Sequence, residues 1–264
     1  MSAFTEEAVQ AALARGPLDY TLRRSPHARR VRVVVDPRQG VLVTVPGGRR
    51  LAARDGRRIA AEFVREREAW IRRHLDRHAR QRAEHAARGP LGPGSRVQLG
   101  GIEHALVLVP APHGTRRAMV LLDAGAAQLI VRPAPRDARP LDSVLRDWFR
   151  ERARSAIDEA IGVHAAALGV RPVAVTIRDP RTRWGSASRA GRLSFSWRLA
   201  LAPPEALETV VVHELAHLRV FGHGPRFWAL VASRRPDHVL WRRWLRDHSV
   251  ELHAALETPD GEAA

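Results

Sequence analysis

The sequence contains no cysteine, and its 264 residues include neither lysine nor asparagine. The missing cysteine excludes disulfides, cysteine-based zinc sites and catalysis by a thiol. Any bound metal must therefore be held by histidine and carboxylate side chains. Because lysine is absent, all 44 basic residues are arginine, which is what codon bias in a GC-rich genome produces.

Positive charge dominates the composition, with a net charge of +16 at pH 7 and a pI of about 11.7. Such a charge is typical of proteins that bind nucleic acid or another polyanion. The arginines are spread along the chain, however, and do not gather in a basic arm. Nucleic acid therefore stays open as a partner but is not favoured by the sequence.

Long apolar runs are also missing. The most apolar stretch, residues 118–131, is interrupted by Asp123 and Gln128 and is too short to span a bilayer. The first residues carry Glu6 and Glu7 where a secretory signal has positive charge. The sequence thus predicts a cytoplasmic protein with no membrane contact.

The apolar periodicity predicts strands and helices in alternation, with no internal repeat. Period-2 alternation predicts a hairpin in residues 31–45, and helical spacing predicts one long helix or two in residues 51–87. Further strands are expected at residues 96–99, 105–109, 118–122, 128–131, 173–178 and 192–197. Further helices are expected at residues 141–168, 203–220, 225–233 and 237–256. Three prolines in residues 132–140 predict a domain boundary.

The segment His213-Glu214-Leu215-Ala216-His217, an HExxH motif, lies in one of these helices. Residues four apart share a helix face, so His213 and His217 can bind one cation. Glu214 lies about 100° around the helix and is placed to reach a water on the metal. The neighbouring residues are valine, leucine and alanine, and among them these polar groups are costly unless a metal satisfies them.

A third histidine, His223, follows His217 by six positions, just after Gly222. Glycine lets the chain turn sharply there, so His223 can return toward the metal. Three protein ligands and one open position are characteristic of catalytic zinc sites. The alternative, a set of core histidines, requires a chance match expected only roughly 0.06 times in the chain. The sequence predicts one Zn²⁺ per chain with Glu214 as the general base.

Further motifs lie around the histidines and in the first half of the chain. They are Arg183-Trp184-Gly185-Ser186, Trp197-Arg198-Leu199, His223-Gly224-Pro225-Arg226-Phe227-Trp228, Pro236-Asp237, Tyr20-Thr21-Leu22-Arg23 and Leu99-Gly100-Gly101. Together with the HExxH segment they resemble the YgjP-like metallopeptidase family, a relative of the SprT-like and WLM zinc proteases. The resemblance spans nearly the whole chain.

The resemblance implies zinc ligands at His213, His217 and His223 and a catalytic Glu214. It also implies that Arg183-Trp184-Gly185 and Phe227-Trp228 frame the site, and we expect substrate contacts at Arg183, Trp184, Gly185 and Trp228. The chain departs from the family in having Ala187 where cysteine is usual, Ser196 where asparagine is frequent and His238 where an aromatic residue is frequent. Metzincins share the spacing of the third histidine but need glycine at the position of Val220, which argues against that group.

Other candidate residues have a simpler interpretation. His74 and His78 are four apart, with His85 beyond them, but their segment is rich in arginine and is predicted to be a solvated face. A second group is either an anion-binding face or a solvated surface: Arg32, Arg49, Arg50, Arg57 and Arg58. Trp184 is either a substrate contact or a core residue. His238 is a candidate transition-state donor, and Trp241 and Trp244 are predicted to pack in the core.

The predicted fold class is α+β. We expect an N-terminal β-rich part with a long helical segment (residues 1–137), a zincin-like minimal metallohydrolase domain with its active-site helix on a small antiparallel sheet (138–256), and a disordered tail (257–264). Three functions stay open: a metallopeptidase, which is favoured; a nucleotide pyrophosphohydrolase of the UTP type, an activity ascribed to some members of the family; and a nucleic-acid-associated SprT-like protease. A sheet edge beside the site would favour peptide, and a basic surface would favour the other two.

Overall fold

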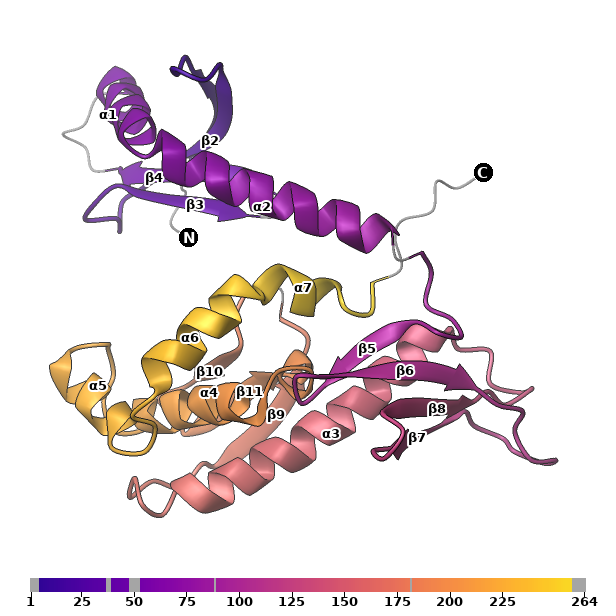
Figure 1. The fold of residues 1–264 in the computed structure, drawn as a ribbon. Helices are drawn as coiled ribbons and strands as arrows, with labels where there is room; N and C mark the ends of the chain where they lie inside the picture. The colour runs from indigo at the N-terminus through magenta and orange to yellow at the C-terminus, as the bar shows by residue number, and fades with distance from the viewer. Residues whose placement is uncertain (1–4, 37–38, 48–52, 88, 181, 258–264) are drawn as a thin grey trace. The chain divides into compact units, whose positions relative to one another are not determined.

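The computed structural model describes residues 5–36, 39–47, 53–87, 89–180 and 182–257 (Figure 1). In this part of the chain there are seven α-helices, one 3₁₀ helix and eleven strands in three sheets. The mixed α+β class expected from the sequence is confirmed. The chain divides into two compact units between Glu84 and His85. Residues 258–264 of the expected tail lie outside the described residues.

The first unit is a four-stranded sheet followed by helices. Its strand order is β1 (Thr5–Ala11), β2 (Leu18–Ser25), β4 (Gly40–Pro46) and β3 (Arg32–Asp36). The expected hairpin is the antiparallel pair β3–β4, and the helical segment is two helices, α1 (Ala53–Glu66) and α2 (Glu68–Ala87). Alternate residues Val41, Val43 and Val45 are buried in one core with Val64 and Ile71 of the helices. The period-2 pattern of β4 therefore exists because one face of the sheet is covered.

The second unit begins with a sheet of the same design. Its order is β5 (Arg96–Leu99), β6 (Ile102–Leu108), β8 (Gln128–Arg132) and β7 (Met119–Asp123). In both sheets the two central strands are parallel and the outer pairs are antiparallel. Asp36 and Asp123 end equivalent strands, and their Oδ1 atoms accept backbone N–H groups from Gln39 (2.8 Å) and Ala126 (3.0 Å). The structure thus contains a repeated four-strand arrangement that the sequence did not reveal.

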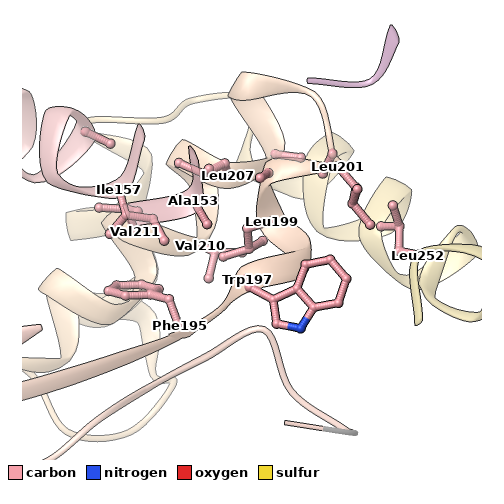
Figure 2. Packing of buried hydrophobic residues seen from close by; sticks show 14 of the residues in the cluster. Ala153, Ile157, Phe195, Trp197, Leu199, Leu201, Leu207, Val210, Val211 and Leu252 are labelled. Atoms are coloured by element: carbon pink, nitrogen blue, oxygen red, sulfur yellow. The ribbon is translucent and has the colours of Figure 1, made fainter. Parts of the chain in front are cut away.

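Helix α3 (Leu141–His164) is the base of the second unit. Four of its side chains, spaced four residues apart, are fully buried: Leu145, Phe149, Ala153 and Ile157. This stripe packs against the 3₁₀ helix η1 (Trp197–Ala200) and helix α4 (Pro204–His217), as Figure 2 shows for Ala153 and Ile157. Buried residues at this spacing on one side of the helix are what the apolar periodicity of the sequence predicts.

Strands β5 to β8 belong to the same core as α3, which differs from the boundary expected after residue 137. Apolar side chains from the sheet, Leu106 and Leu129 among them, are buried in the core cluster that contains α3. The backbone N–H of Gly100 also donates to the carbonyl of Ala200, at 2.8 Å. The prolines of residues 132–140 therefore mark a loop between a sheet and a helix of one core.

We expect a chain shortened to begin at Pro90 to fold and hold metal, whereas one that begins at Arg139 should be markedly less stable. The shorter chain loses four buried side chains, Val97, Leu106, Leu129 and Val131. Each contributes about 1.5–3 kcal/mol when fully buried. Thermal unfolding of both fragments tests this, and equal melting temperatures would show that the sheet is not part of the core.

The third sheet has the order β10 (Gly185–Ala187), β11 (Arg192–Ser196) and β9 (Ala174–Arg178). Strands β10 and β11 are antiparallel, but β11 and β9 are parallel. The expectation of a wholly antiparallel sheet is therefore wrong. The reason is that the chain crosses from the end of β9 to the far side of β11 before β10 begins, which leaves β10 at the sheet edge.

Three helices complete the described chain: α5 (Pro225–Ala232), α6 (His238–Asp247) and α7 (Ser249–Ala254). The single helix expected at residues 237–256 is thus two helices. Trp241 and Trp244 are half-buried and pack against the core, as predicted. Among the described residues, no helix combines the length and the apolar character that crossing a membrane requires.

Candidate metal centre

Helix α4 carries the HExxH segment through the middle of the second unit. It begins at Pro204, where a missing N–H costs nothing, because the first N–H groups of a helix have no intrahelical partner. Its apolar residues are buried almost all round: Ala206, Leu207, Val210, Val211, Val212, Leu215 and Ala216. The helix contacts α3, α5, α6, η1 and β10. Side chains on α4 are therefore held by packing on several sides.

The three histidines meet at one point beside the C-terminal end of α4. Each pair of Nε2 atoms among His213, His217 and His223 is separated by 3.2 Å. Four ligands arranged tetrahedrally at zinc–nitrogen distances of about 2.0–2.1 Å lie about 3.3 Å from one another. The three imidazoles therefore fit a single zinc ion as they stand.

Backbone geometry after the helix directs the second and third histidines. The Nδ1 of His217 lies 3.3 Å from the carbonyl oxygen of Val220, so the ring N–H donates there and the Nε2 lone pair points into the cluster. Gly222 has a φ of 101°, which side chains other than glycine rarely adopt. The turn at Gly222 brings His223 back, as the sequence suggested.

Burial favours the neutral form of His213 and His217. It lowers the pKa of His213 to about 3, and the neighbouring His217 and His223 lower it further. Burial also lowers the pKa of His217. The neutral ring is the form that binds metal. Phe227 is fully buried, and its ring centroid lies 4.9 Å from His213, 4.4 Å from His217 and 4.9 Å from His223, so it forms an apolar floor beneath the cluster.

Glu214 lies beside the histidines but outside the group of ligand atoms that they form. Its side chain is buried, and burial raises its pKa to about 7, against the opposing charge of Arg183. A Cβ atom at Gly185 would lie only 2.8 Å from the Cγ and Oε1 of Glu214. Glycine at this position therefore allows β10 to lie directly against the carboxylate.

The substitution Gly185→Ala should displace the Glu214 carboxylate and lower activity about tenfold or more, with metal content unchanged, because positioning errors of about 1 Å can cost 10²-fold. Gly162→Ala on α3 is the matched control, since a Cβ there meets nothing within 4 Å. Turnover and bound metal would be measured for both. Unchanged turnover in Gly185→Ala would show that the close contact has no role.

The other predicted framing residues differ in their roles. Trp184 is half-buried, packs against the core and lies 4.9 Å from the ring of His253, which favours the core interpretation. Arg183 is exposed, and its charge acts on Glu214. The ring of Trp228 lies 5.7 Å from His213 and 5.6 Å from His223. Arg183, Gly185 and Trp228 thus lie at the site, and Trp184 supports it from the core.

His238 contacts the site through Trp228. The two rings are stacked at 5.3 Å with an interplanar angle of 8°, and the imidazole is buried. The sequence did not single out Arg242, whose Cζ lies 4.0 Å from the centre of the Trp228 ring. The signal for it was its spacing, because residues four apart on α6 share a face. His238 and Arg242 therefore hold the indole that packs against His213 and His223.

The histidines of α2 do not form a comparable group among the described residues. The Nδ1 of His74 lies 2.8 Å from the carbonyl oxygen of Trp70. His78 is buried, so the expectation of a solvated face is wrong at that residue. Arg57 and Arg58 form ion pairs with Glu7 and Glu62, as expected of a solvated surface. Arg32 is exposed. The side chains of Arg49, Arg50 and His85 lie outside the described residues.

Three imidazoles around one point, with a buried carboxylate beside them, form a candidate metal site of the kind that metallohydrolases use. The family model of the YgjP-like metallopeptidase domain matches residues 29–248. The chain therefore belongs to the YgjP-like family and is a metallohydrolase, which confirms the resemblance seen in the sequence. Neither the curated proteins nor the solved structures contain a significant match to the chain.

Proposed function

We propose that the protein is a zinc-dependent metallopeptidase with a zincin-like domain. His213, His217 and His223 hold one Zn²⁺, and Glu214 is the general base. The triangle of Nε2 atoms 3.2 Å apart beside a buried carboxylate carries this proposal. Three imidazole donors suit zinc, and a tetrahedral ion would keep one position for substrate or water.

When bound, zinc would supply a Lewis acid and lower the pKa of a coordinated water. The protein's own contribution begins with Glu214, whose raised pKa of about 7 suits a group that takes up and releases a proton. It accepts a proton from the attacking water and delivers it to the leaving amine. Phe227 and the apolar residues of α4 exclude bulk water beneath the ligands.

A peptide substrate is supported by strand β10. It is an edge strand of its sheet, and its Gly185 lies against Glu214. Extended peptides bind such edges as an added strand. The alternative, a nucleotide pyrophosphohydrolase of the UTP type, would use the same residues and is favoured by the positive charge, but the sequence has no glycine-rich phosphate loop. The third function, a nucleic-acid-associated protease, is supported only by the net positive charge of the sequence.

The test is a parallel assay of the purified protein on casein-type substrates and on a panel of nucleoside triphosphates. We expect new peptide termini, loss of activity after chelation and recovery when zinc is added. Release of pyrophosphate without peptide cleavage would assign the site to nucleotides. A zinc-loaded protein that turns over neither substrate class would contradict the enzyme proposed.

A further inference from the structure

The loop between α4 and α5 carries more than a metal ligand. Phe221, two residues before His223, is 53% exposed and lines two neighbouring hollows. The first, of about 500 Å³, is lined by Arg219, Val220, Phe221, Arg226 and Leu230. The second, of about 290 Å³, has four polar side chains in its lining, those of Arg171, Ser188, Arg189 and Arg219.

Four arginines line these hollows, and among the described residues no carboxylate pairs with any of them. Elsewhere in the same unit arginines do pair, as Arg154 does with Asp158 at 2.6 Å. The Cζ of Arg189 lies 5.6 Å from the centre of the Phe221 ring. Arg219 is held through Nη1, which donates to the carbonyl of Leu168 at 3.1 Å. Like charges gathered without counter-charge repel, and an anionic ligand would relieve that repulsion.

This Arg–Phe221 cluster (Arg171, Arg189, Arg219, Arg226 and Phe221) is connected to the metal centre from two directions. On the helix side, Val220 precedes Phe221, and its carbonyl accepts the ring N–H of His217. On the sheet side, Arg189 lies in the turn that follows β10, the strand whose Gly185 touches Glu214. Strand β10 ends at Ala187, so a peptide paired with it would run from Glu214 toward the turn that carries Arg189.

We propose that the Arg–Phe221 cluster is a specificity subsite for acidic side chains of the peptide substrate. This rests on the proposed peptidase function. Guanidinium groups bind carboxylates through paired, charge-assisted hydrogen bonds, and Phe221 provides an apolar surface for the stem of an acidic side chain. Arg219 lines both hollows, Arg226 only the first, and Arg171 and Arg189 only the second. Charges spread over two hollows suit successive side chains of an extended peptide better than one compact phosphate chain.

The test measures binding separately from cleavage. Two labelled decapeptides of the same sequence, one with glutamate and one with glutamine at the outer positions, are titrated against the full-length, zinc-loaded protein carrying Glu214→Gln. We expect the acidic peptide to bind about tenfold more tightly at low salt, with an advantage that shrinks as ionic strength rises. The double variant Arg189→Gln/Arg226→Gln should remove most of that advantage. The control Arg96→Gln, which changes an exposed arginine on β5, should not.

Equal affinity for the two peptides, or a preference that survives the double variant, would overturn the subsite. So would arginine-dependent binding of UTP that exceeds that of the acidic peptide, because the cluster would then serve phosphate. Cleavage of the peptides by the parent protein is a separate measurement, and it tests the proposed peptidase function independently of the subsite. An arginine-dependent acidic preference without any cleavage would support the subsite and refute the peptidase.

Discussion

Replacement of Glu214 by glutamine should lower turnover by a factor on the order of 10² to 10⁴, the usual scale for losing general acid–base catalysis. Glutamine keeps the shape of the side chain but cannot take up the proton. The variant should fold and retain metal, because the carboxylate lies outside the ligand group of the three histidines. Its buried position also means that a neutral amide removes a charge that burial disfavours.

Turnover, metal content and melting temperature are measured together on this variant. Glu205→Gln is the matched control, since Glu205 is exposed in the first turn of the same helix. It should match the parent protein in all three measurements. Full activity in Glu214→Gln would refute the proposed mechanism for a peptide and for a nucleotide alike, because both reactions need an activated water.

Replacement of one metal ligand should have an effect of similar size on zinc affinity. We expect His223→Ala to weaken zinc binding on the order of 10²-fold or more, since even the outer partners of metal ligands contribute 10- to 100-fold. His223 is exposed, so its loss should not disturb the core. The parent protein should contain about one zinc per chain, and its melting temperature should fall after chelation because the metal binds only the folded state.

The matched control is His113→Ala, an exposed histidine in the loop between β6 and β7. It should retain zinc and the melting temperature of the parent. The variant with alanine at His213, His217 and His223 should contain no zinc above background. If that triple variant bound zinc as tightly as the parent, the ligand assignment would be wrong.

The candidate site could be predicted to a large extent because its core is local in the chain. His213 and His217 share a helix face by spacing alone, and His223 follows within one short loop. The glycine at position 222 predicted the turn that brings His223 back. Its φ is 101°, a value that residues other than glycine rarely adopt. These relations depend on a few consecutive backbone angles, which residue types strongly constrain.

Strands were predicted where a sheet has one covered face and missed where the pattern is weak. Strand β4 alternates buried and half-buried residues, so its period was visible. Strand β10 consists of Gly185, Ser186 and Ala187, whose small side chains carry no hydrophobic period. Its importance comes from the contact between Gly185 and Glu214, and these residues are far apart in the sequence.

The α+β class, the helix that carries Glu214 and the three histidines capable of sharing a metal could all be predicted from local periodicity and spacing. Which segments share a core became visible in the folded chain alone, where β5 to β8 pack with α3 across the prolines taken for a boundary. Folding also pairs β9 with β11 in parallel and brings arginines from separate segments around Phe221. Those contacts join residues distant in the chain, and their free energy depends on burial and charge that appear only when the elements are packed together.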